Sequence, residues 1–173
     1  MNYIRLLIII SSLFLTACIS ANKNDGYLID SDIIVLGKSA EGYSIGDTII
    51  DNGRVYIINT AGTIGEILEI DLFSNLTFDS IIYNKDQRAI FINSSLIIAI
   101  VGLNPDKKIT YDAIALSMGI DKFILNYGES ELEIISKENS NIYLYKKLGI
   151  ALFDDNKDGT IDMYIIFSEK TFD

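Results

Sequence analysis

Short apolar runs separated by turn residues fill most of the chain beyond residue 26, and this pattern predicts a β-rich fold. The runs are rich in isoleucine, whose branched side chain favours extended backbone. An Asp51-Asn52-Gly53 turn between residues 48–50 and 55–58 predicts a hairpin, because Asn-Gly readily takes the positive φ angles of a tight turn. A second turn is predicted at Ala61-Gly62 and an exposed turn at Pro105. Further strands are expected at residues 64–70, 81–83, 88–92, 96–101, 131–135, 142–145, 150–153 and 163–167.

One segment has the periodicity of a helix. From Ile120 to Tyr127 the apolar residues fall at positions i, i+3, i+4 and i+7, which places them on one stripe. Asp121 would lie in the first turn, where a negative charge is favourable, and Gly128 suits the left-handed position after the last turn. Taken together, the patterns predict an α+β fold, a predominantly antiparallel β-sheet with one or two short helices packed on it.

The amino terminus follows a different pattern. Arg5 precedes an apolar run of ten residues, from Leu6 to Leu15, which is shorter than the roughly 20 residues a spanning helix needs. The run ends in Leu15-Thr16-Ala17-Cys18. This segment resembles the lipobox of a bacterial lipoprotein precursor, which reads Leu, a small residue, Ala or Gly, and then Cys.

The resemblance implies cleavage between Ala17 and Cys18, with diacylglycerol attached to the cysteine and an acylated amino terminus. Two or three acyl chains hold a soluble domain at a membrane, whereas one does so only marginally. An ordinary secretory signal or an uncleaved anchor are the alternatives. The expected organisation is a removed signal peptide (1–17), a lipidated tether (18–25) and a single α+β domain (26–173), with two small sub-units dividing near residue 105 as the alternative.

The location implied is the bacterial cell envelope. Ile19 follows the cysteine where an Asp would retain the protein at the inner membrane in enteric-type sorting. We therefore expect the outer membrane in a bacterium with two membranes and the outer face of the cell membrane otherwise.

The composition excludes several classes of catalytic and metal-binding site. The 173 residues include no His, no Trp and one Cys, which excludes a Ser-His-Asp triad, a Cys-His dyad and a His- or Cys-cluster zinc site. The net charge is −10, and removal of residues 1–17 would take away Arg5 alone and leave −11. No basic stripe offsets this charge, so we do not expect a nucleic-acid partner. With Cys18 lipidated, the fold must hold without a disulfide.

The segment 154–162 (DDNKDGTID) carries the sharpest internal motif. Asp or Asn stands at positions 1, 3, 5 and 9, and Gly159 at position 6 permits a sharp bend. The flanks are strand-like and position 12 is Ile165, so the loop resembles the strand-loop-strand calcium loops of integrin-type β-propeller repeats rather than an EF-hand. The alternative is an Asx-rich hairpin turn, and both interpretations stay open. The candidate calcium ligands are Asp154, Asn156, Asp158, Thr160 (through its carbonyl) and Asp162.

The order of features from Ile114 to Ile135 is similar to that of the small lipoproteins that assist outer-membrane barrel assembly, and of related inhibitor-like folds. An apolar stretch is followed by Gly119, a short amphipathic helix, the closing Gly128 and a strand. The proline common after the closing glycine is absent, since Glu129 follows.

These features predict a membrane-anchored envelope lipoprotein with a non-enzymatic binding or structural role. Its expected partners are the membrane, through the N-terminal lipid, and another envelope protein. The alternative is a calcium-dependent or carboxylate-based envelope hydrolase, for which Glu129, Glu131 and Glu133 would share one face of a strand. Such a row is more often a solvated sheet face.

Overall fold

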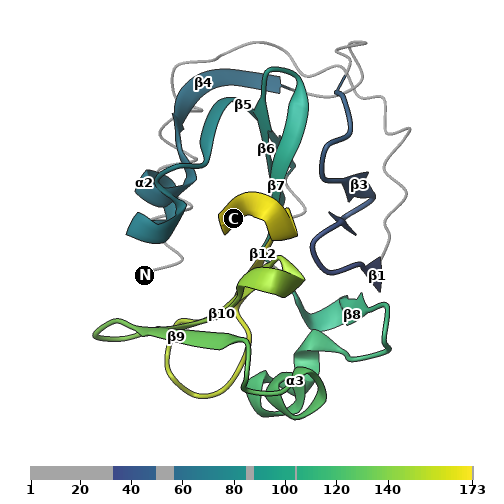
Figure 1. The fold of residues 1–173 in the computed structure, drawn as a ribbon, viewed down its shortest axis with the longest axis vertical. Helices are drawn as coiled ribbons and strands as arrows, with labels where there is room; N and C mark the ends of the chain where they lie inside the picture. Colours follow the sequence, from purple (N-terminus) through teal and green to yellow (C-terminus); the bar gives the residue numbers. More distant parts are fainter. Residues whose placement is uncertain (1–32, 50–56, 85–87, 104, 173) are drawn as a thin grey trace.

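The structure, a computed structural model, describes residues 33–49, 57–84, 88–103 and 105–172. Sheet dominates these residues, in an α+β arrangement (Figure 1). The strands are β1 (Ile33–Ile34), β2 (Ser39–Ala40), β3 (Tyr43–Ser44), β4 (Ile57–Thr63), β5 (Thr77–Asn84), β6 (Arg88–Asn93), β7 (Leu96–Gly102), β8 (Ile109–Thr110), β9 (Leu132–Ser136), β10 (Asn141–Tyr145), β11 (Ile150–Asp154) and β12 (Met163–Phe167). The described α-helices are α2 (Ile64–Leu68) and α3 (Ile120–Tyr127), and 3-10 turns lie at η1 (Asp71–Phe73), η2 (Pro105–Lys107), η3 (Leu116–Met118), η4 (Lys146–Leu148) and η5 (Glu169–Phe172).

Eight strands form one antiparallel sheet in the order β4-β5-β6-β7-β12-β11-β10-β9. The order contains two four-stranded meanders, β4 to β7 and β9 to β12, each built from consecutive strands. Their last strands meet, with Gly102 opposite Tyr164 and Ala99 opposite Phe167. The two meanders therefore run outward from a common seam between β7 and β12, and β4 and β9 are the edge strands.

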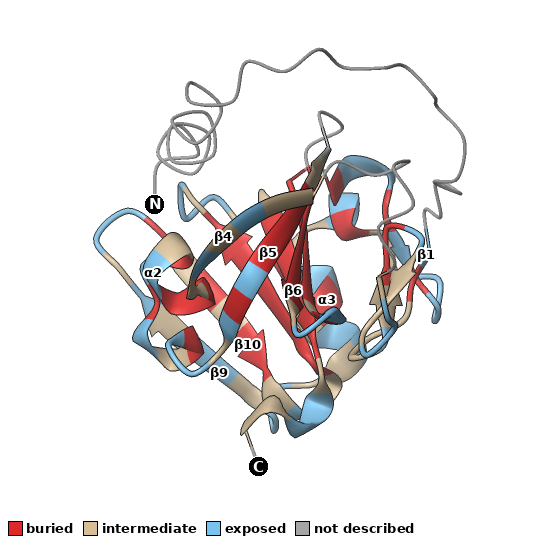
Figure 2. Ribbon diagram, turned by 90° about the horizontal axis from the view of Figure 1, so that it is seen from above, coloured by how far each residue is buried: buried red, intermediate tan, exposed pale blue. Residues whose placement is uncertain are grey.

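Both faces of this sheet are covered at its centre, so the central strands are buried throughout rather than in alternation (Figure 2). One face packs α2, η1 and the C-terminal Phe172 over Phe91, Phe153 and other residues of both meanders. The opposite face packs residues 33–49, η3 and α3 over a second apolar cluster. The seam lies between these two cores.

The smaller strands fix the segment 33–49 against the second face. β1 pairs in parallel with β8, with Ile33 opposite Ile109. β2 and β3 form a tight hairpin, and the backbone N–H of Gly46 donates to the Ile97 carbonyl of β7 at 2.8 Å. The amino-terminal segment of the described chain is thus attached both to the sheet and to the β8 region.

Most of the predicted strands are confirmed, including the buried strand β7 and the four strands of the second meander. The predicted helix from Ile120 to Tyr127 is confirmed with the same bounds, as α3. Gly128, just after its end, has a positive φ of 80°. None of the helices in the described ranges is long and apolar enough to span a bilayer.

Three local predictions are wrong. Residues 64–70 do not form a strand: Ile64–Leu68 is α2, which begins with a capping box between Thr63 and Glu66. Ala61-Gly62 is not a turn, because β4 continues through it with a register shift between Asn59 and Gly62. Pro105 is buried in η2 rather than exposed. The predicted hairpin turn at residues 51–53, the lipobox and the tether lie outside the described residues.

Candidate functional site

The predicted calcium loop connects β11 to β12. Asp154, the last residue of β11, is buried, and its carboxylate accepts the backbone N–H groups of Asp158 (3.0 Å) and Gly159 (3.1 Å). Asp158 accepts the N–H of Thr160 at 2.8 Å, and Asp162 accepts the N–H of Asp155 at 2.7 Å. These contacts close the loop through its own side chains, as in an Asx-rich turn.

The carboxylates of this loop have pKa values shifted in opposite directions. Burial, together with the charges of Asp158 and Asp154, raises the pKa of Asp162 above its usual value. Burial also raises the pKa of Asp155, whose Oδ1 has no hydrogen-bond partner among the described residues. The backbone N–H of Thr160 lowers the pKa of the exposed Asp158. In the described part of the chain no group of three or more acidic side chains is arranged to hold a metal ion, and calcium binding stays a prediction.

The predicted row of glutamates is divided by the fold. Glu133 lies in β9, and Glu131 directly precedes the strand. These two residues form exposed ion pairs with Lys146 (2.7 Å) and Lys147 (2.6 Å), respectively, whereas Glu129 lies further from the strand. Glu129 lines a shallow hollow beside α3 together with Asp121. The two paired glutamates belong to a solvated strand edge, where such ion pairs contribute little.

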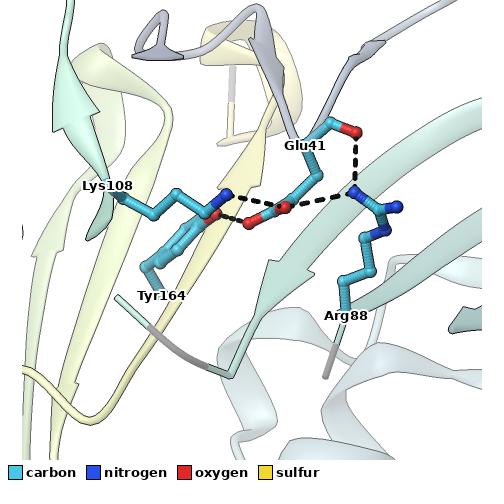
Figure 3. Close-up of polar contacts among 4 residues, drawn as sticks. All are labelled: Glu41, Arg88, Lys108 and Tyr164. Atoms are coloured by element: carbon cyan, nitrogen blue, oxygen red, sulfur yellow. Dashed lines mark hydrogen bonds and ion pairs between the residues drawn. The ribbon is translucent and has the colours of Figure 1, made fainter. Parts of the chain in front are cut away.

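The strongest polar cluster is one that sequence analysis missed. Glu41 lies at the turn between β2 and β3, and its carboxylate is buried against residues from three other elements (Figure 3). Lys108, just before β8, is 3.0 Å from Oε2. Arg88, the first residue of β6, places Nη1 3.3 Å from the same oxygen and 3.2 Å from the Glu41 carbonyl. The Tyr164 hydroxyl of β12 donates to Oε1. We call these four residues the Glu41 cluster.

The sheet itself builds the floor of this cluster. Gly102 of β7 lies between Arg88 and Tyr164, since it is the cross-strand partner of both. A Cβ at Gly102 would come within 2.3 Å of the Tyr164 ring, so the glycine leaves the space that the ring occupies. The tyrosine can then cross β7 and reach Glu41.

Glu41 has a strained backbone conformation. It has a φ of 55°, and Gly42 follows with a φ of 78°. A two-residue hairpin with both φ angles positive is a type I′ turn, in which Asn or Gly is the usual first residue. A glutamate there is uncommon, and its three side-chain partners offset the strain.

The geometry of the cluster favours a structural role. Glu41, Arg88, Lys108 and Tyr164 are all at least nine-tenths buried. A buried carboxylate enclosed by two cations and a hydroxyl holds four chain segments together. It attaches the segment 33–49, which follows the predicted tether, to β6, β8 and β12.

Comparisons with known proteins identify no significantly similar protein. No protein-family description matches the chain, and no curated protein and no solved structure is significantly similar to it. The resemblances to lipoprotein precursors and to barrel-assembly lipoproteins therefore stay predictions from the sequence.

Proposed function

We propose that this chain is a lipid-anchored protein of the bacterial cell envelope with a non-enzymatic binding or structural role. The observation that carries the proposal is Leu15-Thr16-Ala17-Cys18 at the end of a ten-residue apolar run, with the only cysteine of the chain at the position where lipid would be attached. The membrane location proposed is the outer membrane, or the outer face of the cell membrane where only one membrane exists.

The described fold supports this proposal in one respect. The anchor would act on the domain through the segment 33–49, because that segment is the first described part of the domain after the predicted tether (18–25). Glu41 joins this segment to the sheet by buried ionic contacts, and Ile34 and Ala40 join it by apolar packing. Such an attachment stabilises a domain that is held at a membrane by its amino terminus, since the segment cannot detach from the sheet without exposing buried charges.

Lipidation is tested by labelling cells with radioactive palmitate. The wild-type chain should incorporate the label and Cys18→Ser should not. Thr16→Ser keeps a small residue in the lipobox and should be labelled like the wild type. Cys18→Ser combined with Ser20→Cys restores a thiol two residues away, so it should stay unlabelled unless the cysteine is acylated without regard to its position. Label in Cys18→Ser would refute the anchor.

The alternative function is a calcium-dependent or carboxylate-based envelope hydrolase. Its candidate carboxylates lie in the loop 154–162 and around the hollow lined by Asp121 and Glu129. Release of fragments from purified envelope glycans by the wild type, lost in Asp121→Asn or Asp162→Asn, would favour this alternative. A crosslinking pull-down from the native envelope would identify a protein partner and favour the binding role.

A further inference from the structure

We propose that the outer side of the β1–β8 pair is a membrane-contact surface that rests on the bilayer carrying the anchor. The surface consists of Ile33, Ile109 and Tyr111, and we call it the β1–β8 face. The proposal rests on lipid attachment at Cys18, because the anchor is what brings this face to a bilayer.

The β1–β8 face is apolar and open. Ile33 is 53% exposed, Ile109 41% and Tyr111 79%, so that three of the seven large apolar side chains exposed in the described residues gather here. Scattered single apolar residues need no explanation on a protein surface, whereas a contiguous group indicates a contact site.

Strand pairing makes the group contiguous. Ile33 and Ile109 are direct partners in the parallel β1–β8 pair. The backbone N–H of Tyr111 donates to the Ile34 carbonyl at 2.8 Å, which extends the pairing by one residue. Ile34 and Thr110 point inward and are buried, so the three alternating residues share the opposite side.

The position of the lipid anchor in the sequence indicates that a membrane is the partner of this face. Ile33 is the first described residue, and it lies fifteen residue steps after Cys18. A chain of that length spans at most about 50 Å when fully extended. The described part of the domain therefore begins at the β1–β8 face, within that distance of the lipid.

The chemistry of the face suits the interfacial region of a bilayer. Tyrosine prefers that region because its ring is apolar and its hydroxyl remains hydrated. Among the described residues, the exposed charges close in sequence to Ile109 and Tyr111 are those of Asp106, Lys107 and Asp112, and they provide no excess of positive charge. With a net charge of −11 on the mature chain, contact would be apolar and would favour zwitterionic over anionic lipid.

The absence of tryptophan from the chain allows a direct test. The chain from Cys18 onward retains all described residues, and its only thiol can be coupled to a maleimide phospholipid in phosphatidylcholine vesicles. In Tyr111→Trp we expect a blue-shifted emission that brominated phosphatidylcholine quenches. Ile134→Trp is the control reporter, since β9 lies at the other end of the molecule from β1 (Figures 1 and 2).

A matched pair of substitutions tests the role of the face. Ile33 and Ile134 are the same residue type and are both 53% exposed. In the Tyr111→Trp background, Ile33→Asp should abolish the blue shift and the quenching, whereas Ile134→Asp should leave both unchanged. Circular dichroism of each variant checks that the sheet is intact. Quenching that is absent from Tyr111→Trp, or equal in the two reporters, would overturn the proposal.

The test separates this proposal from the proposed function. Coupling through maleimide supplies an anchor whether or not the cell lipidates Cys18, so palmitate labelling and tryptophan quenching can fail independently. A second copy of the chain is the competing occupant. Self-association in sedimentation experiments without vesicles, lost in Ile33→Asp and kept in Ile134→Asp, would assign the face to a dimer and overturn the membrane assignment.

Discussion

Single residues with unusual backbone or burial define the polar interior of this protein. Glu41 combines both, because it has a positive φ and a carboxylate that is shielded from solvent. Nothing near it in the sequence indicates the cluster, since Arg88, Lys108 and Tyr164 come from distant positions. The Glu41-Gly42 pair is a signal for a tight turn, but only the fold shows which charges meet there. The sequence likewise gives no indication of the role of Gly102, whose lack of a side chain leaves room for the Tyr164 ring.

At this scale we predict that Glu41→Gln is strongly destabilising. The amide would leave Arg88 and Lys108 beside a neutral group, and breaking a buried ion pair costs about 3–5 kcal/mol. Urea unfolding at neutral pH should show a free energy of unfolding lower by about 3 kcal/mol.

The matched control for this substitution is Glu131→Gln. It removes the exposed pair with Lys147 and should change the free energy of unfolding by less than about 1 kcal/mol. Equal losses in the two variants would show that the Glu41 cluster does not clamp the segment 33–49.

At the scale of elements, the sequence predicts strands and the longer helix well but not the short helix. α3 has a full apolar stripe over two turns, so periodicity alone identifies it. α2 has only five residues, and its isoleucines have a high propensity for strands. The capping box of Thr63 and Glu66 was the local signal for a helix start, and it outweighs the β propensity of isoleucine once Ile64 and Leu68 pack into the core.

The loop from Asp154 to Asp162 carries a second prediction, on pH. A raised pKa means that folded Asp162 binds its proton more tightly than the unfolded chain does, so this group costs stability as pH rises above about 4. Asp162→Asn should therefore raise the thermal midpoint at neutral pH and have little effect near pH 3.

Asp158 has a lowered pKa, and its ionised form stabilises the fold at neutral pH. Asp158→Asn should lower the midpoint there and not near pH 3. Changes of the same sign in both variants would contradict this assignment.

The same loop provides a test for calcium. Asp154, Asp158 and Asp162 accept backbone N–H groups, and these hydrogen bonds stabilise the loop as an Asx-rich turn. We expect equal thermal midpoints in calcium and in EDTA. A higher midpoint in calcium, lost in Asp162→Asn, would instead establish the calcium interpretation, because ligand binding to the folded state raises stability.

On the scale of the whole molecule, two similar meanders share one sheet. The core beneath α2 contains Phe91 and Val101 from the first meander and Phe153 and Ile165 from the second. The sequence alone allows either a single domain or two small sub-units that divide near residue 105. The position between β7 and β8 does fall between the meanders, but the pairing order of distant strands is not readable from a local pattern of apolar residues.

We predict that the two meanders unfold together. The β7–β12 seam and the shared core link them, so urea unfolding followed by circular dichroism and by tyrosine fluorescence should give one coincident transition. Ile165→Ala, in the seam, should lower the free energy of unfolding by about 2–5 kcal/mol without splitting that transition. Two separate transitions would indicate two sub-units.

The seam also determines the order in which the strands can pair during synthesis. Within each meander, strands pair with the strand made just before them, but Ala99 must wait for Phe167, which is 68 positions later. Until β12 has been made, the apolar strand β7 is an open edge that any extended chain could join. A chain that crosses a membrane before it folds would expose this edge in a crowded compartment. Rapid synthesis of the second half therefore shortens the time during which β7 can pair with a strand of another chain.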